Sequence, residues 1–213
     1  MTDKLTQLFR ELTGDGPCKA EQLRAGGSNR SYFRLAGSDG KAYIGVEGTS
    51  LKEDRAFCEL ARHFRKRGIN VPEVLAHTAD YSAYIQENLG DTALFDIPDG
   101  PEKDELIFET IRMLPKIQFE GAEGLDWSLC FPQKEFDARM VHFDLNYFKY
   151  CFLKPSGIEF DEIALEEDFS RMAAVLLENR SETFMYRDFQ ARNVMIKDGE
   201  PYFIDFQGGR KGP

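Results

Sequence analysis

The segment from Tyr186 to Gln207 constrains the fold of this chain more than any other. Two short runs of strand-forming residues, 194–196 and 202–204, lie on either side of Asp198-Gly199. This dipeptide is typical of a tight hairpin turn, because glycine tolerates the positive φ that such turns require. The segment therefore predicts a β-hairpin near the end of the chain.

The predicted hairpin brings polar side chains together. Folding back at the turn puts Asn193 and Asp205 side by side, within about one residue of register. Asp188 lies on the loop that enters the first strand. Amide and carboxylate oxygens suit Mg²⁺ held by few protein groups and by phosphate oxygens, and a second carboxylate could accept a proton from an attacking hydroxyl. Phosphoryl transfer needs this division of labour between metal and base.

The alternative is an ordinary surface hairpin in which Asp188 and Asn193 are turn or cap residues. Two observations favour the functional interpretation. The spacing Asp-x4-Asn, followed after a hairpin by Asp-Phe, is the arrangement found in kinases. Asp205 also follows an apolar strand, where an unpaired carboxylate is costly without a metal or another partner.

The rest of the chain changes character near Gly90, and the fold class we expect is α+β. In the first part we predict helices over 1–13 and 53–67, with strands at 23–25, 31–35, 42–46, 71–76 and 82–86. Three strands, a helix and two strands indicate a small antiparallel sheet with one packed helix. In the second part the apolar spacing predicts helices over 106–117, 133–153 and 163–177. We expect an N-terminal lobe over residues 1–88 and a mostly helical lobe over 89–213.

Charge and composition exclude some classes of function. The chain has 27 Lys and Arg against 37 Asp and Glu, a net charge of −10. It therefore lacks the basic footprint of a general nucleic-acid binder or of a surface for anionic membranes. The four cysteines form no C-x-x-C pair, which favours reduced, mostly buried thiols in a cytoplasmic protein. With no apolar run of signal-peptide or membrane-spanning length, we expect a soluble protein with no nucleic-acid or membrane partner.

The chain resembles the aminoglycoside phosphotransferase/choline kinase family, which has a protein-kinase-like fold. Within that family it is most similar to bacterial sugar and amino-sugar kinases. The resemblance runs across nearly the whole chain in the expected order. The matching segments are YRD-x4-N at 186–193, IDF at 204–206, GGSNRSYFRL at 26–35 and YIQENLG at 84–90.

The resemblance implies roles for individual residues. Asp188 would be the catalytic base, and Asn193 and Asp205 would bind Mg²⁺. Backbone groups of Glu87 and Leu89 would hold the adenine of ATP. The loop residues implied over the phosphates are Gly27, Ser28, Asn29 and Arg30. Arg192 could face phosphate or an acidic substrate, or form a surface ion pair.

The chain departs from the family in two respects. The third strand, at 42–47, has no lysine to pair with the phosphates and with a glutamate on the next helix, so Arg30, Arg34 or Lys52 could supply that charge. Family members also continue beyond the Asp-Phe motif through further helices. We therefore expect a fragment, a domain or the product of a shortened gene, whose helical lobe exposes apolar surface unless a partner chain or the missing C-terminal segment covers it.

The sequence thus predicts an ATP- and Mg²⁺-dependent kinase that phosphorylates a hydroxyl of a sugar or amino sugar. The alternative is a nucleotide-binding regulatory module, or an inactive fragment that needs a partner. Three other features are assigned structural roles. We expect core packing for the aromatic segment 136–153, a half-buried position for Trp127, and a solvated helix face for the acidic run 162–168.

Overall fold

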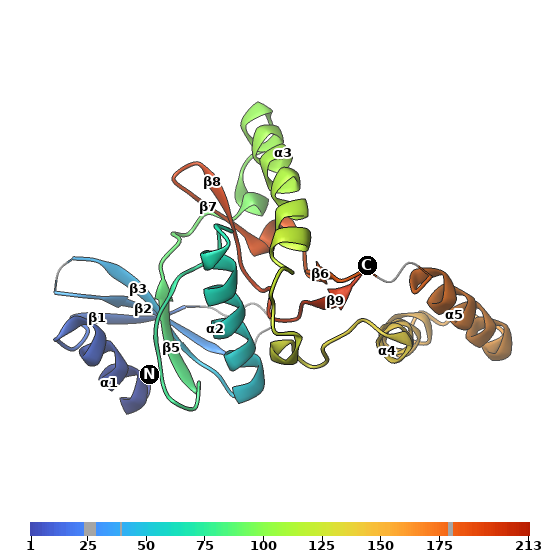
Figure 1. Cartoon of the computed structure of the whole chain (residues 1–213), viewed down its shortest axis with the longest axis horizontal. Coiled ribbons are helices and arrows are strands. Elements are labelled where there is room, and N and C mark those ends of the chain that lie inside the picture. Colours follow the sequence, from blue (N-terminus) through green and yellow to red (C-terminus); the bar gives the residue numbers. More distant parts are fainter. Residues whose placement is uncertain (24–28, 39, 179–180) are drawn as a thin grey trace.

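The computed structural model describes residues 1–23, 29–38, 40–178 and 181–213. In these ranges the N-terminal part is an antiparallel sheet, and the C-terminal part is mainly helical (Figure 1). The strand order in the sheet is β1-β2-β3-β5-β4. The strands are β1 (Lys19–Leu23), β2 (Ser31–Ala36), β3 (Ala42–Glu47), β4 (Val74–His77) and β5 (Ala83–Glu87).

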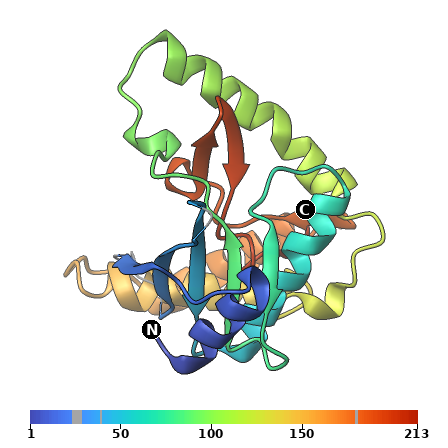
Figure 2. The same ribbon diagram turned by 90° about the vertical axis from the view of Figure 1, so that its left-hand side faces the viewer.

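Two helices, α1 (Asp3–Thr13) and α2 (Leu51–Lys66), cover the two faces of this sheet (Figure 2). Alternate residues of a strand point to opposite faces, and the buried side chains divide accordingly. One cluster joins α1 to the sheet through Leu5, Phe9, Phe33, Leu35 and Ile85. The other joins α2 to Ile44, Val46 and Tyr84. The sheet is thus the middle layer of three.

The C-terminal part contains three helices and two small sheets. The helices are α3 (Pro101–Pro115), α4 (Ala138–Phe148) and α5 (Glu162–Leu176). Strand β6 (Thr183–Met185) pairs with β9 (Arg210–Gly212), and β7 (Val194–Lys197) pairs with β8 (Glu200–Phe203). Shorter helical turns lie at Leu94–Asp96, Lys116–Glu120, Trp127–Leu129, Lys149–Leu153 and Ala191–Asn193.

Helices α4 and α5 lie beside each other and extend away from the rest of the molecule (Figure 1). No helix in the described part of the chain is both long enough and apolar enough to cross a lipid bilayer.

The predicted order of three strands, a helix and two strands is confirmed, but several element boundaries differ; α3, for example, begins at Pro101 instead of 106. The first strand covers Lys19–Leu23 instead of 23–25, and residues 24 and 25 lie outside the described ranges. Its residues are largely exposed at the sheet edge, so no alternation of apolar residues marks it. Helix α4 begins at Ala138 instead of 133, because the Asp137 carboxylate accepts a hydrogen bond from the Met140 N–H and caps the helix there.

A cluster of aromatic rings joins the two parts of the molecule. Phe206 stacks on Phe57 of α2 with ring centroids 5.0 Å apart, and its edge contacts Phe64 at 5.5 Å. Phe64 also contacts Phe184 of β6 at 5.0 Å. All four rings are buried. The packing of Phe206 therefore fixes the chain just after Asp205 against α2.

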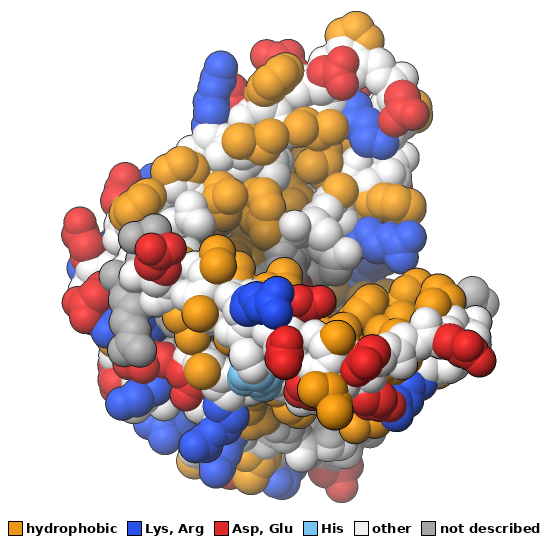
Figure 3. Space-filling view, turned by 90° about the vertical axis from the view of Figure 1, so that its right-hand side faces the viewer, with side chains coloured by type: hydrophobic (Ala, Val, Ile, Leu, Met, Phe, Trp, Pro, Cys, Tyr) orange, Lys and Arg blue, Asp and Glu red, His pale blue; other side chains and the backbone are white. Residues whose placement is uncertain are grey.

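The predicted core packing of the aromatic segment 136–153 is wrong for most of its rings. Met140 and Val141 are buried, whereas five aromatic side chains are exposed: Phe143, Tyr147, Phe148, Tyr150 and Phe152. The expectation that the helical lobe exposes apolar surface is confirmed. Figure 3 shows apolar side chains gathered on the face toward α4 and α5. Helical periodicity identified an apolar face correctly, but nothing in the described chain covers it.

The smaller structural predictions fare better. Trp127 is half-buried against the core, and most of the acidic run 162–168 is exposed on α5. All four cysteines are free thiols. Cys58 and Cys130 are buried as expected, but Cys18 and Cys151 are exposed, so burial holds for half of them.

Candidate active site

The hairpin β7–β8 forms as predicted and brings Asn193 and Asp205 together. Asp198 and Gly199 at its tip have φ angles of 53° and 81°, the left-handed conformation that a two-residue turn requires. Val194 pairs with Phe203, so Asn193 and Asp205 lie just beyond the paired residues. The Asn193 amide Nδ2 donates to Asp205 Oδ2 over 3.2 Å and to the backbone carbonyl of Asp188 over 3.0 Å. One amide thus joins the three predicted residues.

Asp205 has a backbone conformation and contacts that the sequence did not indicate. Its φ is 64°, in the left-handed region, which is uncommon for residues other than glycine. Gln207 Nε2 donates to its Oδ1 over 2.7 Å. The sequence predicted that a carboxylate here needs a metal or another partner. The side chain is exposed and has such partners, since it accepts hydrogen bonds from Gln207 and Asn193. The buried ring of Phe206 carries the packing at this point.

Asp188 lies on an anchored loop after β6. Tyr186 is buried and its hydroxyl donates to the Ile204 carbonyl, which ties the loop to the end of the hairpin. Arg187, with a φ of 73°, donates to both carboxylate oxygens of Asp144 on α4 over 2.9 and 2.8 Å. In the described ranges no hydrogen bond occupies the Asp188 carboxylate. A Cβ placed on Gly208 would lie 3.4 Å from its Oδ2, so the carboxylate lies close to the backbone at Gly208.

The electrostatic environment of Asp188 suits a proton acceptor. Partial desolvation raises the pKa of its carboxyl, and the negative charge of Asp205 raises it further. The guanidinium groups of Arg187 and Arg210 act in the opposite direction, and the net direction is upward. A carboxylate with a raised pKa is a better base toward a hydroxyl than an ordinary aspartate.

The donor set at the hairpin fits Mg²⁺. The described residues contain no group of three or more His, Cys, Asp or Glu side chains arranged to hold a metal. Asn193 and Asp205 offer one amide oxygen and one carboxylate side by side, and water and phosphate oxygens would take the other positions around a bound cation. Mg²⁺ is commonly held in this way with nucleotides. Because the NH₂ group of Asn193 donates to two oxygens, the amide oxygen is its atom for a cation.

The predicted nucleotide-binding residues lie in segment 27–30 and in the segment that begins at Glu87. Gly27 and Ser28 lie outside the described residues. Asn29 is exposed and Arg30 is buried at the start of β2. The Glu87 N–H donates to the Glu73 carbonyl over 2.8 Å. This N–H is therefore already occupied and does not face an adenine.

Of the three candidate cations, Arg30 is the one connected to the site. Its Nη2 lies 3.0 Å from Glu53 Oε1, and its Nε donates to Asp54 Oδ1 over 2.7 Å. Arg34 pairs with Asp91, and Lys52 is exposed. Sequence reasoning missed Glu53, Asp54 and Gln207. Glu53 and Asp54 are acidic residues in the first turn of α2, and this position was the feature of the sequence that could have indicated them.

Arg192 has a position that neither sequence interpretation described. Its guanidinium lies over the ring of Phe95, 4.3 Å from the centroid, as in a cation–π contact. Phe95 is half exposed. Arg192 directly precedes Asn193 in the chain, and no ion pair is formed by Arg192 within the described ranges.

Comparison with known proteins identifies the family. Residues 19–213 match the model of a group described as the phosphotransferase enzyme family. The chain belongs to this family. The chain is 25% identical over 191 residues to an N-acetylmuramate/N-acetylglucosamine kinase of Pseudomonas aeruginosa, an alignment that covers 87% of this chain and 54% of the relative. It is 27% identical over 192 residues to the protein of the same name from Neisseria meningitidis, covering 86% and 55%.

The chain thus spans about half the length of the curated relatives it matches. Among solved structures, the ternary complex of streptomycin, ATP and APH(2")-IIa superposes with a TM-score of 0.69 at 14% identity. That match covers all of this chain and 72% of the other. It confirms the expected protein-kinase-like fold of the family.

Proposed function

We propose that this chain is the catalytic part of an ATP- and Mg²⁺-dependent kinase that phosphorylates a hydroxyl of a small molecule, namely a sugar or amino sugar. The observation that carries the proposal is the hydrogen-bonded pair of Asn193 and Asp205 beside the Asp188 loop. An amide and a carboxylate for the metal, together with a separate carboxylate, are the groups that phosphoryl transfer requires.

In this proposal each residue has a distinct task. Asn193 and Asp205 hold Mg²⁺, which when bound neutralises charge on the phosphates of ATP. Asp188 orients the acceptor hydroxyl and takes its proton as the oxygen bonds to the γ-phosphorus. The bond from the γ-phosphorus to the β–γ bridging oxygen breaks, and ADP leaves with that oxygen. The raised pKa of Asp188 favours this proton transfer.

The acceptor class is proposed from the two relatives, which are named as kinases of N-acetylmuramate and N-acetylglucosamine. Because the chain spans about half of each, we propose that further polypeptide completes the acceptor pocket. That polypeptide would lie against the exposed apolar residues of α4 and α5, either as part of the same chain or as a partner chain.

Replacement of Asp188 by Asn tests the proposed base. We expect acceptor-dependent release of ADP from Mg-ATP to fall by about 10²–10⁴-fold, the usual contribution of general-base catalysis. The affinity for Mg-ATP, measured by calorimetry, should stay near that of the wild type. The acceptor panel should contain amino sugars, neutral sugars, choline and aminoglycosides.

Asp198→Asn is the matched control. It makes the same chemical change at the tip of the neighbouring β7–β8 hairpin, at an exposed turn position whose positive φ asparagine tolerates. Turnover by Asp188→Asn at the level of this control would refute the assignment of the base. Binding of Mg-ATP with no turnover by any variant, even on a longer chain that completes the pocket, would favour a nucleotide-binding module instead.

A further inference from the structure

A continuous series of polar contacts runs from the start of β2, through α2, to the candidate metal ligand Asp205. Arg30 Nη2 lies 3.0 Å from Glu53 Oε1. The same Glu53 oxygen accepts from Gln207 Nε2 over 3.4 Å. Gln207 Nε2 also donates to Asp205 Oδ1 over 2.7 Å. Glu53 of α2 and Gln207 therefore connect the Arg30 guanidinium to the Asp205 carboxylate.

Gln207 is the link that connects the two carboxylates. A glutamine amide has two N–H donors, and Glu53 and Asp205 each accept from this one. Gln207 is buried, so solvent does not readily replace either bond. The position of the Glu53 carboxylate therefore determines where the Gln207 amide lies, and the amide determines the orientation of Asp205.

Asp205 needs such a restraint more than most aspartates. Its carboxylate is exposed, and its backbone has a φ of 64°. Two amides hold its two oxygens, Gln207 at Oδ1 and Asn193 at Oδ2. The Asn193 amide is held in turn by the Asp188 carbonyl. Of these two amides, Gln207 is the one that also bonds to a side chain of α2.

Two ionic contacts of Arg30 with α2 can be separated. Its Nε donates to Asp54 Oδ1, a fully buried carboxylate. Its Nη2 contacts Glu53, which is one third exposed and faces Gln207. Breaking a fully buried ion pair chiefly destabilises a fold. A substitution of the partly exposed Glu53 should chiefly change the position of the Gln207 amide, which donates to it.

We propose that Arg30 and Glu53 are positioning residues that act through Gln207 to hold the Asp205 carboxylate in its metal-binding orientation. This inference rests on the proposed function, since it assumes that Asp205 binds the metal of a metal–nucleotide complex. In this inference the positively charged side chain near the site is that of Arg30, next to β2. Glu53, in the first turn of α2, helps to orient the metal ligand Asp205.

The test is metal-dependent nucleotide binding by the whole 213-residue chain carrying Glu53→Gln. Calorimetric titration with Mn²⁺-ATP, and with ADP in EDTA, separates the metal-dependent part of the affinity. We expect Glu53→Gln to weaken Mn²⁺-ATP binding roughly 10-fold, as expected for the loss of a group that supports a metal ligand. Binding of ADP in EDTA and the Tm should stay close to wild type.

Glu59→Gln is the matched control, because it makes the same change on the same helix. Glu59 contacts Arg62 and Tyr81 instead of Gln207, so its Mn²⁺-ATP affinity should equal that of the wild type. Asp54→Asn tests the other contact and should lower the Tm with little effect on Mn²⁺-ATP affinity. Arg30→Lys, which keeps the charge, should lie between wild type and Glu53→Gln.

A double-mutant cycle tests whether the effect passes through Gln207. If it does, Glu53→Gln combined with Gln207→Met should bind Mn²⁺-ATP no more weakly than the weaker single variant, because both changes break one path. Additive losses would overturn the inference, and so would a Glu53→Gln affinity equal to that of Glu59→Gln. In either case the proposed function would stand. Absence of metal-dependent nucleotide binding by the wild type would overturn both.

Discussion

At the scale of single residues, Gly48 shows how closely the support for the site is packed. A Cβ on Gly48 would lie 1.9 Å from Asp54 Oδ2 and 2.4 Å from Oδ1. Asp54 is fully buried and accepts a hydrogen bond from Arg30, so its carboxylate cannot move without losing that bond. Position 48, just after β3, therefore requires glycine, because the carboxylate of Asp54 on α2 occupies the space of a side chain.

We therefore expect Gly48→Ala to displace Asp54 from Arg30 and to lower the free energy of unfolding by about 3 kcal/mol, the typical cost of breaking a buried ion pair. Urea denaturation measures this difference. Gly16→Ala is the control, because its Cβ would meet only Arg10 Nη2, at 3.8 Å. Equal stability of the two variants would show that the Asp54 site tolerates the displacement.

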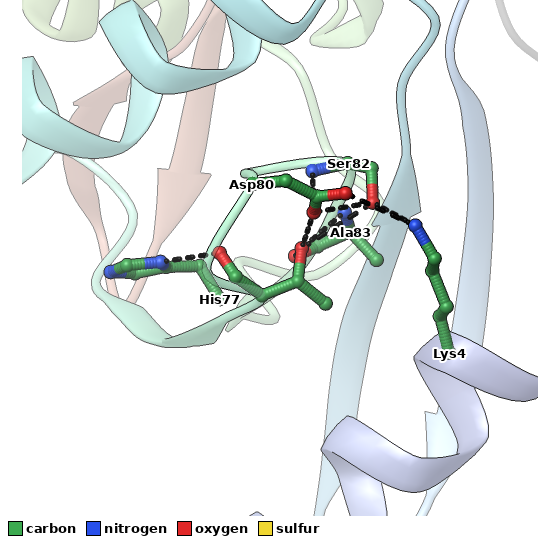
Figure 4. Close-up of polar contacts among 6 residues, drawn as sticks. Lys4, His77, Asp80, Ser82 and Ala83 are labelled. Carbon is green, nitrogen blue, oxygen red and sulfur yellow. Dashed lines mark hydrogen bonds and ion pairs between the residues drawn. The ribbon is translucent and has the colours of Figure 1, made fainter.

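At the scale of elements, the turn between β4 and β5 is held by one carboxylate. Asp80 accepts hydrogen bonds from the Ser82 hydroxyl over 2.7 Å, the Ser82 N–H over 3.1 Å and the Thr78 hydroxyl over 2.8 Å (Figure 4). Its other oxygen lies 3.1 Å from Lys4 Nζ. The side chain thus closes the turn and connects it to α1, on the face of the sheet away from α2.

These contacts make the stability of the turn depend on pH. The bonds from Ser82, then those from Thr78 and Lys4, hold the pKa of the Asp80 carboxyl well below its usual range. A carboxyl whose pKa is lowered by folding stabilises the fold above its unfolded pKa of about 4, and this stabilisation is lost as the pH falls through the folded value. Wild type should therefore melt above Asp80→Ala at neutral pH, and the difference in Tm should shrink in acid.

Thermal melts between neutral and acid pH measure this difference. Lys4→Met removes one of the contacts to the Asp80 carboxylate, so it should lower the Tm at neutral pH by less than Asp80→Ala does. A difference in Tm between wild type and Asp80→Ala that stays constant with pH would contradict a role for the charged form.

At the scale of the whole molecule, the exposed apolar surface is concentrated in the helical part (Figure 3). On α4, Phe143 is 63% exposed and Tyr147 is 67% exposed; on α5, Val175 is 70% exposed. Clustered exposure of this kind is uncommon on monomers and marks interaction surfaces. This exposed face is the surface against which the proposed further polypeptide would pack.

The isolated chain should consequently self-associate through this face. We expect Phe143→Ser combined with Tyr147→Ser to weaken concentration-dependent association by about 30-fold, since each of the two exposed rings contributes on the order of 1 kcal/mol to a contact. Sedimentation velocity over a range of concentrations measures it. Phe108→Ser, an equally exposed ring on α3, should leave association unchanged. A wild-type chain that is monomeric throughout would contradict the prediction.

The sequence predicted those parts of the fold and site that depend on local interactions. Turn residues Asp198-Gly199 fixed the hairpin, and its register followed from the flanking strands, so the meeting of Asn193 and Asp205 was confirmed. The edge strand β1 was misplaced because its residues are mostly polar and exposed. The start of α4 was misplaced because the cap at Asp137 overrides the apolar spacing before it.

What the sequence by itself determined is the order of the elements, the family and the three residues brought together by one hairpin. Only the tertiary structure decided the rest. It joined Arg30, Glu53 and Gln207, which lie far apart in the chain, because residues distant in sequence meet only where elements pack. It also decided the exposure of the aromatic residues in 136–153. Periodicity shows that a helix has an apolar face, but burial of that face requires another surface to cover it.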